Sequence, residues 1–212
     1  MVLASANRNK QREFGAFFDS LSGLLGQDVT LALPGEFSVC PGEDEVLESG
    51  RTYEENALIK ARAWVRSAGI PAIADDSGLE VRHLSWAPGV HSARAAEGSD
   101  ADRIDWLLSG LNGAKDRRAC FVACIVIAFP TADSGGRDYF ASEGRCWGSI
   151  AHEPSGESGF GYDPVFVPCG CNATFGDLGP DIKSKISHRA AAMAGVVKMM
   201  ESVLKYHALC GI

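Results

Sequence analysis

Several features that would place the chain in a specialised class are missing from its 212 residues. No run approaches the roughly 18 apolar residues of a membrane-spanning helix, so we expect no membrane partner. The first ten residues lack a basic segment followed by a long apolar run, so we expect no signal peptide. Repeats, low-complexity tracts and evident linkers are also lacking. The sequence therefore predicts one domain over residues 1–212.

An excess of positive charge is missing as well. The chain has 20 Lys and Arg residues against 27 Asp and Glu residues, which gives a net charge of −7. This balance argues against broad electrostatic binding to nucleic acid. An anionic ligand would therefore need a locally basic pocket, or a metal ion, within an acidic protein.

Recognisable metal-binding patterns are scarce. The pair Cys169 and Cys171 has no second pair at zinc spacing, and the five histidines are scattered. Seven cysteines, an odd number without a signal peptide, indicate reduced thiols and a cytoplasmic location. Cys120 and Cys124 lie in a strand-like apolar segment and are expected to be core residues.

The chain does contain an alternation of strand and helix patterns. Apolar residues at helical spacing and capping residues predict helices over 8–25, 52–69, roughly 100–110 and 187–207. Strands are expected over 1–5, 29–33, 71–75, 79–84, 117–130 and 137–151, and an acidic loop over 34–50. Ser77 and Gly78 are expected to turn the chain between the strands 71–75 and 79–84. This order predicts a mixed α/β fold, with a central twisted sheet flanked by helices.

Two groups of polar residues fit poorly with a purely structural role. The segment IADDSGLEV, residues 73–81, places Asp75 and Asp76 together at the end of a buried strand. Asn56 and Lys60 share one narrow side of an otherwise apolar helix. A buried lysine is uncommon unless it is paired, so this side is a candidate for an anion contact. Equally, Lys60 could extend its ammonium group to solvent.

A third group, SANRNK at residues 5–10, follows a strand and opens a helix. Free backbone N–H groups at a helix N-terminus favour phosphate, and Lys10 would add a positive charge. The P-loop pattern G-x-x-x-x-G-K is absent from the whole chain. An ordinary capped helix start is the alternative.

Two further segments combine glycine, aromatic and basic residues. In SGFGYDPVF, residues 158–166, Gly159 and Gly161 would let Phe160 lie flat against a ligand. A glycine-rich turn with a core phenylalanine is the alternative. In KSKISHRAAAM, the basic residues precede or open a helix, where cations oppose the helix dipole. A bound anion would offset that cost.

These segments together resemble one family. SANRNK, TYEENALIKARAW, IADDSGLEV, APGVHSAR, ESGFGYDPVFVP and ISHRAAAM occur in the order and spacing of the noncanonical purine NTP pyrophosphatases, also called the inosine/xanthosine triphosphatases or the Ham1-like family. The resemblance covers essentially the whole chain. It implies a single elongated domain with a nucleotide cleft between two lobes, and a homodimer. It also implies hydrolysis of ITP, dITP and XTP to the monophosphate and pyrophosphate with Mg²⁺.

The resemblance makes Asp76 a metal ligand and the proton acceptor, with Asp75 beside it. Because a metal-bound carboxylate has a depressed pKa and is a poor base, we expect Asp76 to hold Mg²⁺ and orient the attacking water. Mg²⁺ commonly takes one or two carboxylates together with substrate phosphates. Glu48 is the predicted second ligand, and Glu45 is held in reserve.

The resemblance also implies the substrate-binding residues. The triphosphate would contact Ser5, Ala6, Asn7, Arg8, Asn9, Lys10, Lys60 and Ser77. The base pocket would be formed by Phe160, Gly161, Tyr162 and Asp163, with Phe160 stacked on the purine, and Lys183, His188 and Arg189 would complete the site. The donors of His188 and Arg189 would accept a 6-oxo purine, whereas a 6-amino group would leave them unpaired.

Some positions depart from the family pattern. Ala6 and Asn9 stand where relatives often carry glycine, Ser85-Trp86 replaces a usual Gly-Gly, and the loop Leu47 to Gly50 has one carboxylate fewer than usual.

Two rival functions are also open. One is a nucleotide sensor that has lost hydrolysis. The other is a phosphomonoesterase that uses the aspartate pair as nucleophile and acid.

Overall fold

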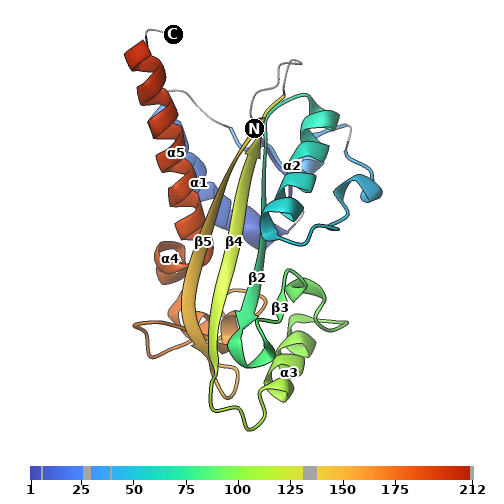
Figure 1. Cartoon of the computed structure of the whole chain (residues 1–212), viewed down its shortest axis with the longest axis vertical. Coiled ribbons are helices and arrows are strands. Elements are labelled where there is room, and N and C mark those ends of the chain that lie inside the picture. Colours follow the sequence, from blue (N-terminus) through green and yellow to red (C-terminus); the bar gives the residue numbers. More distant parts are fainter. Residues whose placement is uncertain (6, 26–29, 39, 131–137, 211–212) are drawn as a thin grey trace. The chain divides into compact units, whose positions relative to one another are not determined.

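The computed structural model describes residues 1–5, 7–25, 30–38, 40–130 and 138–210. Strands β1 and β2 are parallel, whereas β2 and β3, and β5 and β6, are antiparallel, so the predicted mixed sheet is confirmed. Its order is β1-β2-β4-β5-β6, with β3 paired to β2, and Figure 1 shows β2, β4 and β5 side by side. The strands are β1 (Val2–Leu3), β2 (Ala72–Val81), β3 (Pro88–Gly89), β4 (Arg118–Ala128), β5 (Tyr139–Ile150) and β6 (Phe166–Pro168).

The main helices begin at polar caps, as the sequence predicts. In α2, Thr52 Oγ1 accepts the N–H of Glu55 at 3.1 Å, and Glu55 Oε2 accepts the N–H of Thr52 at 3.2 Å. This reciprocal capping fixes the first turn of α2. Ser99 caps α3 in the same way. The α-helices are α1 (Arg8–Leu25), α2 (Tyr53–Ala68), α3 (Asp100–Gly110), α4 (Phe175–Ile186) and α5 (His188–Cys210).

The predicted turn at Ser77 and Gly78 is wrong. Strand β2 runs without interruption through both residues, and Gly78 does not adopt a left-handed φ. The second half of β2 pairs with β3 through the register Leu79 to Gly89, and this pairing overrides the local turn signal. Residues 82–84, expected to extend a strand, form a short 3-10 helix. As successive residues of one strand, Asp75 and Asp76 point to opposite faces of the sheet.

Two other elements differ from the prediction. Of the expected strand 29–33, the described part contributes one isolated bridge, between Ala32 and Val2. Helix α4 was not predicted, because Gly179 (φ 75°) and Pro180 interrupt its pattern and force a non-helical residue inside it. The acidic segment 34–50 is a loop as expected, with two short 3-10 helices, Pro34–Glu36 and Glu43–Val46.

The residues form two compact units. The first contains Met1–Asp76, Cys124–Glu143 and Ala192–Ile212, and the second contains Ser77–Ala123 and Gly144–Ala191. The second unit has a core of buried side chains that includes Leu79, Leu107, Phe121, Phe166 and Phe175. Buried core residues of the first unit include Val2, Leu3, Phe14, Ala57 and Ile73. One domain over residues 1–212 stays a prediction.

Three cysteines lie in the buried part of the sheet. Cys120 and Cys124 lie on β4, which is buried from Ala119 to Ala128, and Cys146 is buried on β5. Burial raises the pKa of Cys120 to about 11. It raises the pKa of Cys124 and of Cys146 to about 12. Because only the thiolate reacts readily, these thiols are expected to be inert in the folded protein.

This leads to a labelling prediction. At pH 8, iodoacetamide should modify the exposed Cys40 and Cys169 and leave Cys120, Cys124 and Cys146 unmodified until the protein is unfolded in guanidinium. Peptide mapping by mass spectrometry gives the extent at each position. Labelling of Cys124 in the native protein as fast as that of Cys40 would contradict the burial described here.

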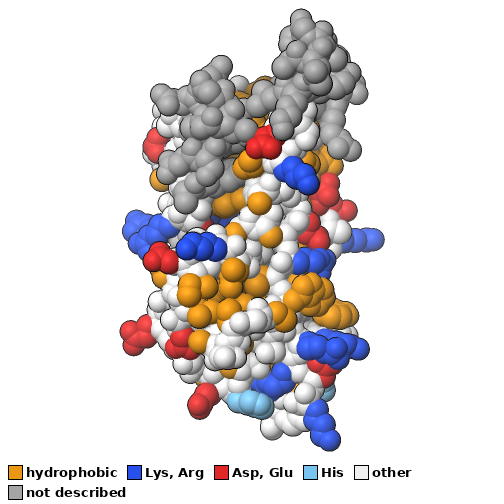
Figure 2. All heavy atoms as spheres, turned by 90° about the vertical axis from the view of Figure 1, so that its left-hand side faces the viewer, with side chains coloured by type: hydrophobic (Ala, Val, Ile, Leu, Met, Phe, Trp, Pro, Cys, Tyr) orange, Lys and Arg blue, Asp and Glu red, His pale blue; other side chains and the backbone are white. Residues whose placement is uncertain are grey.

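Part of the surface is apolar. Figure 2 shows one face of the molecule, on which hydrophobic side chains gather with charged side chains around them. In the second unit, Trp86 and Trp147 are 43% and 50% exposed and pack edge to face, with ring centroids 6.2 Å apart. Ser85 and Trp86 adopt left-handed φ values of 55° and 69°, a conformation that the usual Gly-Gly would adopt without strain. Among the described residues, no helix has the length and apolarity needed to cross a membrane.

Candidate functional site

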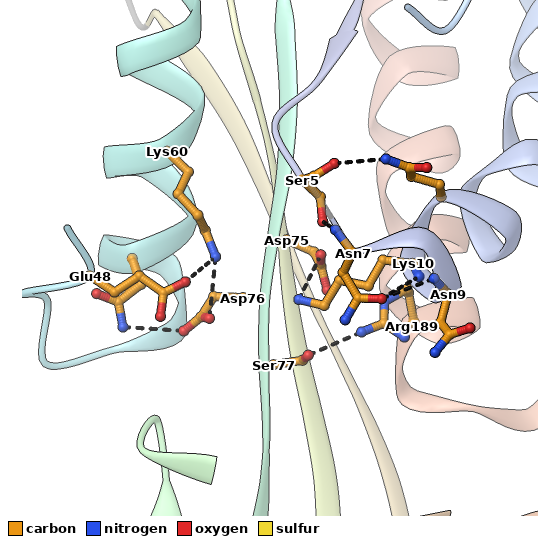
Figure 3. Close-up of polar contacts among 12 residues, drawn as sticks. Ser5, Asn7, Asn9, Lys10, Glu48, Lys60, Asp75, Asp76, Ser77 and Arg189 are labelled. Atoms are coloured by element: carbon orange, nitrogen blue, oxygen red, sulfur yellow. Dashed lines mark hydrogen bonds and ion pairs between the residues drawn. The ribbon is translucent and has the colours of Figure 1, made fainter. Parts of the chain in front are cut away.

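The two adjacent aspartates of β2 belong to two different ion-pair groups. Asp75 is 1% exposed and Asp76 is 5% exposed. Figure 3 shows Asp76 directed towards Lys60 and Glu48, and Asp75 directed towards Lys10. Alternation along the strand thus places two like charges on opposite faces, each with its own lysine.

On one face, Lys60 of α2 contacts two carboxylates. Its Nζ lies 2.6 Å from Glu48 Oε1 and 3.4 Å from Asp76 Oδ1. Burial by itself would lower the pKa of Lys60, but the charges of Asp76, Glu48 and Asp75 together raise it above its ordinary value. Lys60 therefore stays protonated, and it does not extend to solvent as the alternative interpretation of the sequence proposed.

The carboxyl group of Asp76 is held at both oxygens. Oδ1 faces Lys60, and Oδ2 accepts a hydrogen bond from Asn56 Nδ2 at 3.2 Å. Burial raises the pKa of Asp76 above its ordinary value, although Lys60 opposes that effect. Because the Asp76 carboxylate is already removed from water in the folded protein, it would attract a nearby cation strongly.

Glu48 and Asp76 meet at one ammonium group, so their carboxylates face a shared position. Within the described ranges, no group of three or more His, Cys, Asp or Glu side chains is arranged to hold a metal ion. Two carboxylates fit an ion that completes its shell with water and substrate oxygens. Glu45, the reserve candidate, instead accepts the N–H of Gly42 at 2.9 Å and lies 3.8 Å from Arg66.

On the other face, Lys10 of α1 pairs with Asp75. The Lys10 Nζ to Asp75 Oδ1 distance is 3.1 Å, and the two side chains are 16% and 0% exposed. Asn7 Oδ1 accepts the N–H groups of Asn9 and Lys10 at 2.9 and 3.3 Å, so this side-chain oxygen caps α1. Ser5 Oγ accepts the N–H of Asn7 at 3.2 Å. The start of α1 is therefore held by its own side chains.

The remaining side chains of the predicted phosphate segment differ in their exposure to solvent. Arg8 is exposed, and Asn9 is half-buried. Ala6 lies outside the described residues.

In the second unit, the loop around Phe160 is held by Asp163. Asp163 Oδ2 accepts the N–H of Phe160 at 2.8 Å and lies 2.6 Å from Lys183 Nζ. Gly159 has a φ of 84°, and a Cβ there would lie 2.1 Å from Asp163 Oδ2, so this approach requires glycine. The N–H of Gly161 donates to Asp100 Oδ2, at the start of α3, at 2.7 Å.

Two buried cations lie over the ring of Phe160. Lys183 Nζ is 4.3 Å and Arg189 Cζ is 5.9 Å from the ring centroid. Lys183 is 5% exposed and Arg189 is 2% exposed, and Arg189 Nη2 donates to Ser77 Oγ at 3.0 Å. Desolvated cations next to an aromatic face attract it by about 2 kcal/mol. The predicted residues Ser77, Phe160, Lys183 and Arg189 are thus brought together.

Other predicted base-pocket residues have partners within the fold. His188 stacks on Phe121 at a centroid distance of 4.7 Å and an interplanar angle of 17°. The Tyr162 side chain is buried in the core, and its hydroxyl donates to the carbonyl oxygen of Ser92 at 3.0 Å. A contact between Tyr162 and a ligand would therefore come from its backbone.

Two residues of the site were not among the predicted site residues. The sequence placed Asn56 with Lys60 on a side of α2 that was a candidate for an anion contact, and the structure shows that Asn56 is fully buried. Asp100 accepts from the Phe160 loop, 61 residues away along the chain. Nothing local distinguishes Asp100 from an ordinary acidic residue in the first turn of a helix.

The Lys183–Asp163 pair supports a stability prediction. Lys183→Ala should lower the free energy of unfolding by about 3–5 kcal/mol, because the 2% exposed side chain of Asp163 loses the ammonium group that lies 2.6 Å from its Oδ2. Urea titration measures the change. Lys185→Ala, at an exposed position two residues further along the chain, should stay within about 0.5 kcal/mol. Equal effects of the two substitutions would contradict the buried pair.

The chain is similar in sequence and structure to known proteins. The model of the Ham1 family matches residues 1–199. The chain is 38% identical to the dITP/XTP pyrophosphatase of Syntrophobacter fumaroxidans, over 97% of this chain and 84% of the relative. It is 40% identical to the dITP/XTP pyrophosphatase of Desulfotalea psychrophila, over 97% and 87% of the two chains. The solved structure of a HAM1 protein from Coxiella burnetii superposes with a TM-score of 0.78 at 36% identity, over 95% of this chain and 98% of that one.

Proposed function

The chain belongs to the Ham1 family, and we propose that it hydrolyses ITP, dITP and XTP to the nucleoside monophosphate and pyrophosphate. The observation that carries this proposal is the match, over nearly the whole chain, to relatives named dITP/XTP pyrophosphatase. The geometry supports it, because the buried carboxylate of Asp76 beside the partly exposed carboxylate of Glu48, together with buried cations, suits a metal-bound polyanion.

We propose that Glu48 and Asp76 hold Mg²⁺. Two carboxylates that share one cation contact suit this ion, which takes its other ligands from water and substrate phosphates. When bound, the ion would lower the pKa of a coordinated water and polarise a phosphoryl oxygen. Asp76 would orient the attacking water through its carboxylate.

The phosphate groups would be bound by residues of α1 and β2. Lys10 and Lys60 supply ammonium groups. The N–H groups of Asn9 and Lys10 donate to Asn7 Oδ1, so a phosphate would take the place of this cap at the helix N-terminus. Ser77 supplies a hydroxyl, which is already oriented by Arg189. Each lysine would exchange part of its contact with a carboxylate for a contact with phosphate.

The purine would stack on Phe160. Asp163 positions both the backbone of Phe160 and the ammonium of Lys183, so we assign Asp163 a positioning role. The guanidinium of Arg189 has only donors, and a 6-oxo purine offers an acceptor, whereas ATP offers a 6-amino donor. A pocket that requires an acceptor would therefore disfavour ATP.

Two broader properties also belong to the proposal. We place the enzyme in the cytoplasm, in keeping with six described cysteines that are free thiols. We propose a homodimer, in which a second copy would cover exposed apolar side chains such as Trp86 and Trp147. Light scattering coupled to size exclusion would give the mass in solution.

Product analysis tests the reaction class. Purified protein incubated with ITP and Mg²⁺ should give IMP and pyrophosphate in equal amounts. A phosphomonoesterase would release orthophosphate and form a phosphoaspartate. A nucleotide sensor would bind ITP and release no product. Either of these outcomes would overturn the proposal.

A further inference from the structure

Asn56 is the fully buried polar residue of α2 that none of the roles above uses. Its side chain makes two hydrogen bonds in opposite directions. Nδ2 donates to Asp76 Oδ2 at 3.2 Å, and Oδ1 accepts the N–H of Gly50 at 2.8 Å. The partners fix the orientation of the amide, because a carboxylate accepts and a backbone N–H donates.

Gly50 lies two residues after Glu48, in the loop that carries this carboxylate. A Cβ at position 50 would lie 2.7 Å from Asn56 Oδ1 and 2.7 Å from Glu55 Cβ, so the approach of this loop to α2 requires glycine. The same loop is tied to α2 by Arg51 N–H, which donates to Glu55 Oε2 at 2.6 Å. Asn56 continues from this loop to β2, in parallel with the Lys60 ammonium group, which contacts both Glu48 and Asp76.

An apolar residue at this position would remove the hydrogen bonds that the amide makes with the Gly50 N–H and Asp76 Oδ2. Asparagine is a poorer helix former than alanine or leucine, and its burial in a helix is favourable only with both ends bonded. Asn56 is 0% exposed. The two hydrogen bonds offset the cost of burying the amide, and they connect the Glu48 loop to Asp76.

We propose that Asn56 is a positioning residue that sets the separation of the two metal-binding carboxylates. It joins the Glu48 loop to Asp76 through one rigid amide, and it holds Asp76 Oδ2 so that Oδ1 faces the position that Lys60 and Glu48 share. The role of Asn56 rests on the proposed metal site, and it goes beyond that site by naming what holds Glu48 and Asp76 in register. Partners of this kind, one bond removed from a ligand, change metal affinity or activity by about 10–100-fold when they are substituted.

The test measures metal binding directly. Mn²⁺ is titrated into the whole protein in the presence of the non-hydrolysable α,β-imido analogue of ITP, and free Mn²⁺ is followed by electron paramagnetic resonance. Asn56→Ala should weaken Mn²⁺ binding by about 10-fold or more, because Asp76 loses a donor and the Glu48 loop loses an anchor. The KM for ITP at saturating metal should change much less.

Two further variants separate positioning from folding. Glu55→Ala removes the bonds to Arg51 and Thr52 in the same loop but has no bond to Asp76, so it should lower stability and leave Mn²⁺ affinity within about twofold. Asn56→Asp keeps the side-chain volume and the acceptor for Gly50, but it replaces the donor to Asp76 with a like charge beside that carboxylate. It should lower kcat at saturating metal by about tenfold, and it decides the matter if Asn56→Ala does not fold.

Two results would overturn the proposal. Mn²⁺ affinity within about twofold of wild type in Asn56→Ala, or kcat at saturating metal within about twofold of wild type in Asn56→Asp, would remove the positioning role while the metal site stands. Wild-type protein that bound no Mn²⁺ would remove the proposed metal site itself. These failures are distinguishable, because the first is read from the variants and the second from wild type.

Discussion

Asp76→Asn is expected to lower kcat for ITP by about 10³-fold or more while the protein stays folded. The amide keeps the shape of the side chain but removes the negative charge that faces Lys60 and Glu48. One of the two carboxylates proposed for the metal would then be lost. Steady-state pyrophosphate release, with circular dichroism and thermal unfolding as checks of folding, measures the effect.

Asp75→Asn is the matched comparison, since it makes the same change one residue earlier on the opposite face of β2. It breaks the contact with Lys10, so it should raise the KM for ITP more than it lowers kcat. If the Asp76 variant kept substantial metal-dependent turnover, Asp76 would not be at the reacting centre. If the two variants lost kcat equally, the separation of roles between the two faces would be wrong.

Arg189→Ala is expected to lower kcat/KM for ITP by about 10²-fold and to change kcat/KM for ATP far less, so the ratio between them collapses. The guanidinium is 2% exposed, lies over the Phe160 ring and cannot accept a hydrogen bond. Removing it deletes a donor that a 6-oxo group can use and a 6-amino group cannot. The ratio is measured with both nucleotides in parallel pyrophosphate assays.

Two further variants serve as controls for this measurement. Arg189→Lys keeps the charge and should keep part of the preference for ITP, although a single ammonium does not reproduce the planar fork. Ser77→Ala removes the hydroxyl to which Arg189 donates and should leave the ITP to ATP ratio nearly unchanged, because that hydroxyl is assigned to the phosphates. Equal losses on ITP and ATP in Arg189→Ala would make Arg189 a phosphate ligand instead.

The parts of the fold that follow from short-range chemistry were predictable. The caps at Thr52 and Ser99 and the apolar spacing of α1 and α2 gave these helices nearly to the residue. The turn expected at Ser77 and Gly78 failed because strand pairing with β3 overrides a two-residue turn signal. Helix α4 was missed because Gly179 and Pro180 locally oppose a helix that tertiary packing stabilises.

In the candidate site, too, local sequence patterns indicated some features, whereas tertiary contacts decided the others. The sequence left two positions open for Lys60, a contact with an anion or extension to solvent, and the structure pairs it with Glu48 and Asp76. The sequence did not indicate which partner each side chain faces. It did not predict that Asp75 pairs with Lys10 and Asp76 with Lys60. Nor did it predict that the Tyr162 side chain is buried in the core, or that Asn7 Oδ1 caps α1. Substrate identity came from resemblance, because no residue pattern alone names a base.

The most direct test of the central claim is the substrate profile of the purified enzyme with Mg²⁺. Values of kcat/KM for dITP, XTP, dGTP and dATP are obtained from pyrophosphate release under one set of conditions. The proposed function predicts that dITP and XTP are each preferred over dATP by about 10²-fold or more, with the monophosphate as the other product. Comparable values for dITP and dATP, or orthophosphate as the main product, would contradict it.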